Sequence, residues 1–165
     1  MKQEIQFTQS FKSRVNQWAK GELTWAQVEG LSAEKAKEFQ KTACDLVRRG
    51  QLKKAKVIFE GLVALNPKDH VSRAALGTVL QKMDRMDEAM AAYEEAISTS
   101  DTDVVALANR GELRIKKGDV AGGLGDLKRA VEAHPKLTSV SARRAKALAT
   151  AIIVQVAKAG SAAAR

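Results

Sequence analysis

Cysteine and proline are nearly absent from this chain of 165 residues. Its single cysteine, Cys44, cannot form an internal disulfide, which excludes a disulfide-stabilised secreted scaffold. There are only two prolines, and no stretch of the chain is typical of a long linker. Aromatic residues make up 4% of the chain and hydrophobic residues 45%, so a core must be built mainly from Ala, Val, Leu and Ile.

A membrane-spanning segment and a secretory signal are also missing from the sequence. The most apolar stretch, 147–157, is interrupted by Thr150 and Gln155. It is also much shorter than the ~20 residues needed to span a bilayer. The N-terminal residues MKQEIQF lack the apolar run of a secretory signal. We therefore expect a cytoplasmic protein with no membrane insertion.

Motifs for catalysis, for a cofactor or for a metal ion are not found. The sequence contains no metal-ligand spacing, phosphate-binding loop or paired-carboxylate motif. Cys44 could act as a nucleophile only with His70 or His134 as its base, and neither has local motif support. We interpret Cys44 instead as a small, mainly apolar wall residue. The sequence thus predicts that the protein is not an enzyme.

Acidic residues are unevenly distributed along the chain and are absent from its last 28 residues. The net charge is +9, but residues 70–103 carry 3 basic and 7 acidic groups, and residues 138–165 carry 5 basic groups and no acidic group. A basic excess can attract nucleic acid or an acidic protein partner. The basic clusters are not interleaved with aromatics for base stacking, and the acidic middle interrupts any continuous basic stripe, which disfavours nucleic acid. The two clusters are Arg48, Arg49, Lys53, Lys54 and Lys56, and Arg143, Arg144 and Lys146.

What the chain does contain is a motif that returns three times with a spacing of 34 residues. Four positions of the motif hold, in order, a small, a small, a bulky and a small residue. This pattern is typical of the tetratricopeptide repeat (TPR), a helix hairpin that buries its apolar face by stacking on further copies. The first small position is expected where the two helices of a hairpin cross. The four sets are Ala43, Gly77 and Gly111; Ala55, Ala89 and Gly123; Phe59, Tyr93 and Leu127; and Leu62, Ala96 and Ala130.

The repeats predict an all-α, right-handed α-solenoid. Within 34–137 we expect three repeats, at 36–69, 70–103 and 104–137, whose hairpins bend at Gly50, Asp84 and Gly118. Pro67 and Pro135 close the first and third repeats. An N-terminal helical segment is expected at 1–33, a C-terminal capping helix at 138–159 and a frayed tail at 160–165.

Stacked hairpins of this kind form a concave groove lined by the first helix of each repeat. Most inward positions are small or apolar, so we expect an extended apolar client segment there, with backbone hydrogen bonds to Gln40, Gln81 and Asn109. A clamp for a peptide carboxylate is disfavoured, because the places that hold Lys, Asn and Arg in such clamps are here Gln40, Cys44, Ala75, Val105 and Asn109, and none of these is a cation. The expected groove residues are Lys37, Gln40, Cys44, Val47, Val71, Ala74, Thr78, Gln81, Val105, Ala108, Asn109, Glu112 and Ile115.

An apolar stripe precedes the repeats. Phe7, Phe11, Val15 and Trp18 share one face of a helix. This stripe either forms a dimer interface or docks on the first repeat of its own chain, and the pattern does not separate the two.

Residues in the repeats and in the segment before them match a known family. They are Gly21–Ser32 (GELTWAQVEGLS), Gly50, Ala55, Phe59, Leu62, Leu76–Gln81, Ala89, Tyr93 and Gly111–Leu113. At these positions the chain resembles class II chaperones of type III secretion systems, the SycD/LcrH kind, which handle translocator proteins. The resemblance implies a cytoplasmic chaperone that holds an apolar segment of a membrane-inserting client in its groove and dimerises through its N-terminal helix. A TPR assembly scaffold of another bacterial secretion or motility apparatus, and a nucleic-acid binder that uses the basic flanks, are the alternatives.

Overall fold

The computed structural model describes residues 13–14, 16–17, 19–23, 30 and 32–163. Regular structure in these residues is helical throughout, which confirms the predicted all-α class. The chain divides into two compact units, Met1–Ser72 and Arg73–Arg165, and helix α5 crosses from one into the other.

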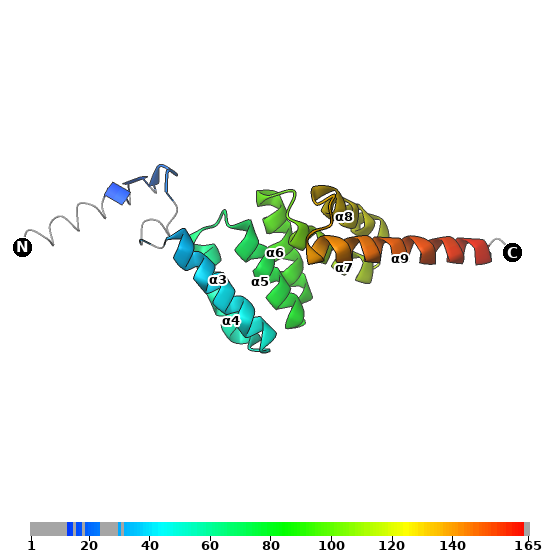
Figure 1. Cartoon of the computed structure of the whole chain (residues 1–165), viewed down its shortest axis with the longest axis horizontal. Coiled ribbons are helices and arrows are strands. Elements are labelled where there is room, and N and C mark those ends of the chain that lie inside the picture. The colour runs from blue at the N-terminus through cyan, green and yellow to red at the C-terminus, as the bar shows by residue number, and fades with distance from the viewer. Residues whose placement is uncertain (1–12, 15, 18, 24–29, 31, 164–165) are drawn as a thin grey trace, which may run out of the picture. The chain divides into compact units, whose positions relative to one another are not determined.

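The first unit contains one complete helix hairpin (Figure 1). Helix α3, Ala33–Arg48, and helix α4, Leu52–Leu65, pack against each other. Ser32 begins α3, because its hydroxyl accepts a hydrogen bond from the backbone N–H of Lys35 at 3.2 Å. The buried side chains at the centre of the hairpin occupy the repeat positions predicted from the sequence, namely Ala43, Ala55, Phe59 and Leu62.

Most of the buried apolar side chains among the described residues lie in the second unit. This unit comprises most of α5, His70–Lys82, and four further helices: α6, Met86–Thr99; α7, Val104–Lys116; α8, Val120–Ala133; and α9, Val140–Ala163. One cluster of buried apolar side chains joins these helices. Tyr93 and Leu127 fill the bulky repeat position and are fully buried, so the pattern of small and bulky residues is a packing pattern.

The three hairpin bends share one backbone conformation. Gly50, Asp84 and Gly118 have φ angles of 73°, 63° and 91°. Glycine adopts this left-handed region without steric cost, and aspartate is among the few other residues that tolerate it. The three bends predicted from the sequence are therefore confirmed.

Glycines at two repeat positions allow neighbouring groups to approach closely. A Cβ atom on Gly77 would lie 2.6 Å from the ring of Tyr93, and one on Gly111 would lie 2.9 Å from the carbonyl oxygen of Gly123. A Cβ on Gly123 would in turn lie 2.6 Å from the carbonyl oxygen of Gly111. The backbones of α7 and α8 meet at this point, as the small residue of the repeat predicts.

A buried ion cluster, which the sequence did not predict, lies between α7 and α8. The Nε and Nη2 atoms of Arg110 donate to the two carboxylate oxygens of Asp126 at 2.8 and 2.7 Å, and Nη1 of Arg114 donates to Asp126 at 3.1 Å. These bonds to the carboxylate raise the pKa of the Arg110 guanidinium. Asp126 is only 3% exposed, so its charge is stabilised by these arginines, and by Arg129 at 4.0 Å, rather than by water.

The last helix is longer than predicted. It begins at Val140, where the Ser139 hydroxyl accepts a hydrogen bond from the backbone N–H of Ala142 at 3.0 Å. It continues to Ala163, so the predicted frayed tail at 160–165 is helical in its first four residues. Alanine is the strongest helix former, and the alanine-rich sequence explains the extension. Among the described helices, none is both long enough and apolar enough to cross a membrane.

Candidate peptide-binding surface

In the first unit, α3 presents its predicted row at the surface. Lys37 and Cys44 are exposed, while Gln40 and Val47 are half-buried. Phe39, which the position count did not select, is also about half exposed. The chain has few aromatic residues, and this one stands next to the predicted inward residue Gln40 in the sequence. That is the signal that sequence analysis could have used here.

Gln40 ties α3 to the start of α5. Its amide nitrogen donates to the Ser72 hydroxyl at 2.8 Å and to the carboxylate of Asp69 at 3.2 Å. Asp69 also accepts from the backbone N–H of Ser72 at 3.1 Å, and this bond holds the first turn of α5. The carbonyl oxygen of Gln40 accepts no hydrogen bond from any described residue. Gln40 can therefore accept a hydrogen bond from a peptide N–H, but its own N–H groups are engaged.

In the second unit, the predicted rows on α5 and α7 lie side by side. The Asn109 amide on α7 donates to the Thr78 hydroxyl on α5 at 3.0 Å. Each row uses residues three and four positions apart, which share one face of a helix. Val105 is 39% exposed, and Thr78, Gln81, Glu112 and Ile115 are half-buried.

A polar network of five side chains crosses this face. The Tyr93 hydroxyl, reaching in from α6, donates to the Gln81 carbonyl oxygen at 2.8 Å and lies 3.4 Å from the Thr78 hydroxyl oxygen. Thr78 accepts from Asn109, whose own carbonyl oxygen accepts from the Arg144 guanidinium on α9. The centre of the face is thus polar and internally bonded, whereas the sequence predicted a mostly apolar wall.

Three residues predicted to line the groove offer almost no surface. Ala74 and Ala108 are each 1% exposed and belong to the hydrophobic core of the second unit. Asn109 is buried, and both of its polar side-chain atoms are engaged, by Thr78 and by Arg144. Position counting gives the direction in which a side chain points but not how closely the neighbouring helix packs upon it. These three residues therefore lie beneath the surface of the face and pack under the residues that line it.

Arg144 is the functional residue that the sequence analysis assigned differently. The sequence places it in a basic cluster with Arg143 and Lys146 and predicts no cation at Asn109. The structure brings its guanidinium to the carbonyl oxygen of Asn109 across 35 residues of sequence. A cation therefore stands at the edge of the α5–α7 face.

Tyr93 makes the polar network measurable by titration. Burial raises the pKa of Tyr93 to about 12. An unfolded tyrosine titrates near 10, so the folded protein holds the phenol proton more tightly than the unfolded chain does. This contribution to the free energy of unfolding is fully present below the unfolded pKa and is lost as the pH rises through the folded pKa.

Tyr93 is the only tyrosine in the sequence, so phenolate absorbance reports it alone. We expect a midpoint near pH 12 for the native protein and near pH 10 for the chain in urea. Circular dichroism recorded along the same titration shows whether the protein is folded or unfolded at the pH where Tyr93 ionises. A native midpoint equal to that in urea, with the helical signal intact, would mean that the hydroxyl is hydrated.

The apolar stripe of Phe7, Phe11, Val15 and Trp18 lies outside the described residues. Its two interpretations, dimerisation and docking on the first repeat, stay predictions. Within the part of the chain that is described, no three His, Cys, Asp or Glu side chains gather in a way that could hold a metal ion.

Comparison with known proteins points to one group of folds. The family model of the tetratricopeptide repeat matches residues 72–103, which correspond to the predicted middle repeat. No curated protein sequence matches the chain significantly. Among solved structures, the translocator chaperone SycD of type III secretion from Yersinia enterocolitica is similar, with 20% identity, a TM-score of 0.70, and coverage of 78% of this chain and 98% of that chain.

Two further structures extend the comparison. A type III secretion complex from Aeromonas hydrophila has 14% identity and a TM-score of 0.73, and covers 87% of this chain and 97% of that chain. SycD from Yersinia enterocolitica in complex with a peptide of the translocator YopD has 21% identity and a TM-score of 0.64, and covers 76% of this chain and 97% of that chain. At these identities the likeness is one of fold, and the chain has the TPR-type fold of type III secretion translocator chaperones.

Proposed function

We propose that this protein is a chaperone that holds an extended apolar segment of a client protein against the α5–α7 face of its second unit. The observation that carries the proposal is the row of exposed and half-buried side chains beside the polar network, with Val105 at one end and Ile115 at the other. The exposed Cys44 and half-buried Val47 on α3 are proposed to contact the client in the first unit.

The chemistry of this face suits an extended chain. The carbonyl oxygen of Gln81 accepts from Tyr93, while its amide nitrogen donates to no described residue and can bond to a client carbonyl. Val105 and Ile115 on α7 supply apolar contact on the same face. Main-chain hydrogen bonds provide affinity for an extended peptide, whereas side-chain pockets provide specificity. Because this face offers a hydrogen bond to the client main chain and general apolar contact, we expect it to bind apolar segments with low specificity.

The solved structures support this class of client by analogy. SycD is described as a translocator chaperone, and one of its structures contains a peptide of the translocator YopD. We propose that the client here is likewise a secreted protein with membrane-inserting segments. Holding such a segment would prevent its aggregation before secretion.

The proposal is tested with labelled peptides of about 15 residues that tile membrane-inserting proteins secreted by the host. We expect Val105→Asp to weaken binding about tenfold or more, because a charge replaces an apolar contact. Fluorescence anisotropy measures the affinity. Val57→Asp on α4 is the matched control, because Val57 is an exposed valine in the first unit, outside the predicted row.

Two outcomes would contradict the proposal. One is an unchanged affinity of Val105→Asp for a peptide that the wild-type protein binds. The other is an equal loss in Val105→Asp and Val57→Asp, which would indicate a general charge effect. Ala74 and Ala108 are unsuitable for this test, because charged side chains at these core positions would unfold the protein.

A further inference from the structure

The C-terminal half of α9 extends beyond the helix that supports it. At about 1.5 Å per residue, α9 with 24 residues is about 36 Å long and α8 with 14 residues about 21 Å. Ala142 and Ala145 near the start of α9 are buried, whereas from Thr150 to Ala159 every side chain except the half-buried Ile152 is exposed. Figure 1 shows the end of α9 projecting past α7 and α8.

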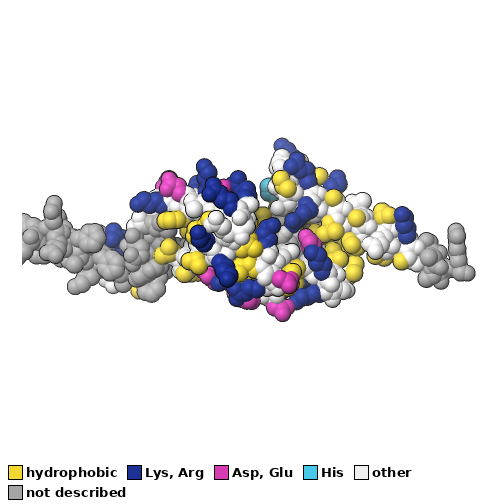
Figure 2. Space-filling view, turned by 90° about the horizontal axis from the view of Figure 1, so that it is seen from below, with side chains coloured by type: hydrophobic (Ala, Val, Ile, Leu, Met, Phe, Trp, Pro, Cys, Tyr) yellow, Lys and Arg dark blue, Asp and Glu magenta, His cyan; other side chains and the backbone are white. Residues whose placement is uncertain are grey.

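The projecting segment carries large apolar side chains. Ile153 is 58% exposed and Val156 is 56% exposed, and Val154 between them is also exposed. Figure 2 shows hydrophobic side chains along the α9 end of this unit, with cationic side chains beside them. Several large apolar side chains exposed on one helix are unusual for a protein surface and mark a contact site.

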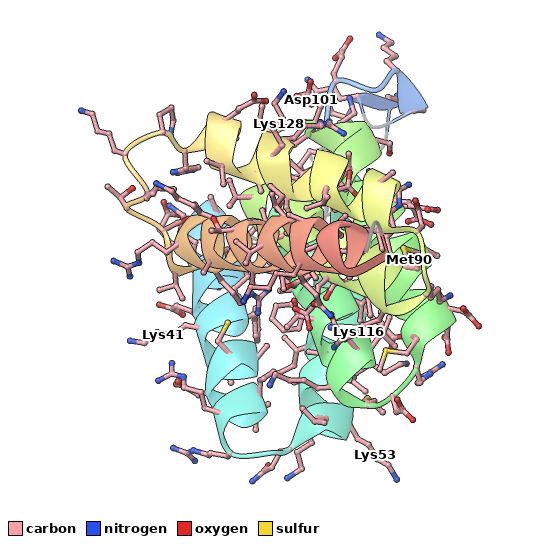
Figure 3. All side chains as sticks on the ribbon, turned by 90° about the vertical axis from the view of Figure 1, so that its right-hand side faces the viewer. Lys41, Lys53, Met90, Asp101, Lys116 and Lys128 are labelled. Atoms are coloured by element: carbon pink, nitrogen blue, oxygen red, sulfur yellow. The ribbon has the colours of Figure 1, made fainter. Side chains whose placement is uncertain are left out.

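A cleft of about 490 Å³ between α8 and α9 continues this apolar surface. Its floor is formed by the apolar residues Leu124, Val131, Ala149 and Ile153. Gly125 also lines it, and a Cβ atom at this position would meet nothing within 4 Å, so there is room for a side chain here. Figure 3 shows α9 running beside α8, which carries Lys128.

The charges around the cleft are mainly positive. Lys128 and Lys146 flank it, and only Glu132 contributes a carboxylate, which lies 3.8 Å from Lys128. Lys146 is exposed and makes no ion pair with any described residue. No Asp or Glu occurs anywhere in 138–165, so α9 supplies no acidic side chain to Lys146.

We propose that the cleft between α8 and α9, together with the projecting end of α9, docks an acidic amphipathic helix of a partner protein. The apolar stripe of that helix would fill the cleft against Ile153, and its Asp or Glu side chains would face Lys128 and Lys146. A second copy of this chain is disfavoured as the occupant, because pairing α9 with another α9 would place cations against cations. This site is separate from the α5–α7 face and does not depend on the proposed client.

The test uses a synthetic helical peptide of about 18 residues, which is long enough to form a helix, with a leucine stripe flanked by glutamates. The comparison peptide has every glutamate replaced by lysine. We expect the acidic peptide to bind, with affinity that falls as salt rises, and the lysine peptide not to bind. Fluorescence anisotropy of labelled peptides measures both.

Three variants localise the binding. Ile153→Asp and Lys146→Glu are expected to weaken it about tenfold or more. Gly125→Leu fills the cleft and is expected to do the same. Val57→Asp on α4 is the control and should bind like the wild-type protein. All four positions are exposed, so circular dichroism should show an unchanged fold.

Any of four results would overturn the proposal. These are no binding of the acidic peptide to the wild-type protein, equal binding of the lysine peptide, and full binding by Ile153→Asp together with Gly125→Leu. The fourth is a result showing that α9 binds something else. In that case Ile153→Asp would abolish self-association in ultracentrifugation, or binding to vesicles of anionic phospholipid.

Discussion

Replacing Asp126 by alanine is expected to lower the free energy of unfolding by about 3–5 kcal/mol, since this leaves buried arginine charge without its partner. Arg110 is itself buried and bonds to both carboxylate oxygens of Asp126, and Arg114 adds a third hydrogen bond. Asp126→Asn should lose most of the same free energy, because an amide cannot neutralise the guanidinium. Urea denaturation measures both variants.

Asp87→Ala is the matched control for this prediction. Asp87 also pairs with a cation, Lys117, at 2.5 Å, but its side chain is 93% exposed. Water and salt screen such a pair, so its removal should leave the unfolding midpoint unchanged. Equal shifts in Asp87→Ala and Asp126→Ala would show that burial does not determine the effect. The double variant Arg110→Met, Asp126→Leu should recover part of the loss, since it removes both charges together.

Alanine substitutions two residues apart on α8 are expected to change stability in opposite directions. Gly123→Ala should cost about 1–3 kcal/mol, because its Cβ would lie 2.6 Å from the carbonyl oxygen of Gly111 and 2.5 Å from the Ile115 side chain. Gly125→Ala should gain about 0.5–1 kcal/mol, because its Cβ meets nothing within 4 Å and alanine favours the helix.

Thermal and urea unfolding of the two variants test this pair of expectations. The helix propensity gained is the same at both positions, so any difference measures the close approach of α7 and α8. A gain in stability for both variants would mean that the helices can separate at little cost. A loss for both would mean that α8 needs its glycines for another reason.

The helices and their bends could be predicted because local signals determine them. Asn66 and Pro67 stop α4, and left-handed bends at Gly50 and Gly118 separate the helices of two hairpins. Asp84 is the less obvious bend, yet aspartate is one of the few residues besides glycine that adopt its φ angle. Each signal involves residues within one turn of each other, so no tertiary contact has to be known.

The ion cluster and the polar network could not be predicted in the same way. Arg110 and Asp126 are 16 residues apart, and Arg144 and Asn109 are 35 apart. A charged residue on an amphipathic helix looks the same in the sequence whether it faces water or a neighbouring helix. Which charges face inward depends on the crossing of α7 with α8 and on the approach of α9. Those distances follow from packing rather than from periodicity.

The sequence indicates the helix face on which each candidate site residue lies, but not how deeply that residue is buried. Thr78 and Asn109, both expected to line the groove, are joined by a hydrogen bond in the structure, and helical spacing determines the face on which each side chain lies. They could not show that Ala74 and Ala108 lie beneath the surface, since small residues allow the adjacent helices to close over them. A small residue at an inward repeat position can therefore either line an open groove or lie buried beneath its surface, and the sequence does not distinguish the two.

The uneven distribution of the core has a consequence for biosynthesis. The main cluster of buried apolar side chains lies wholly in the second unit, from Ala74 to Ala149, whereas Phe59 and Leu62 are the large apolar side chains buried among the described residues of the first unit. Translation delivers the first hairpin before most of that cluster has left the ribosome. The α3–α4 hairpin therefore emerges with little apolar burial among its own described residues, and we expect it to be more open to proteases than the helices of the second unit once these have folded.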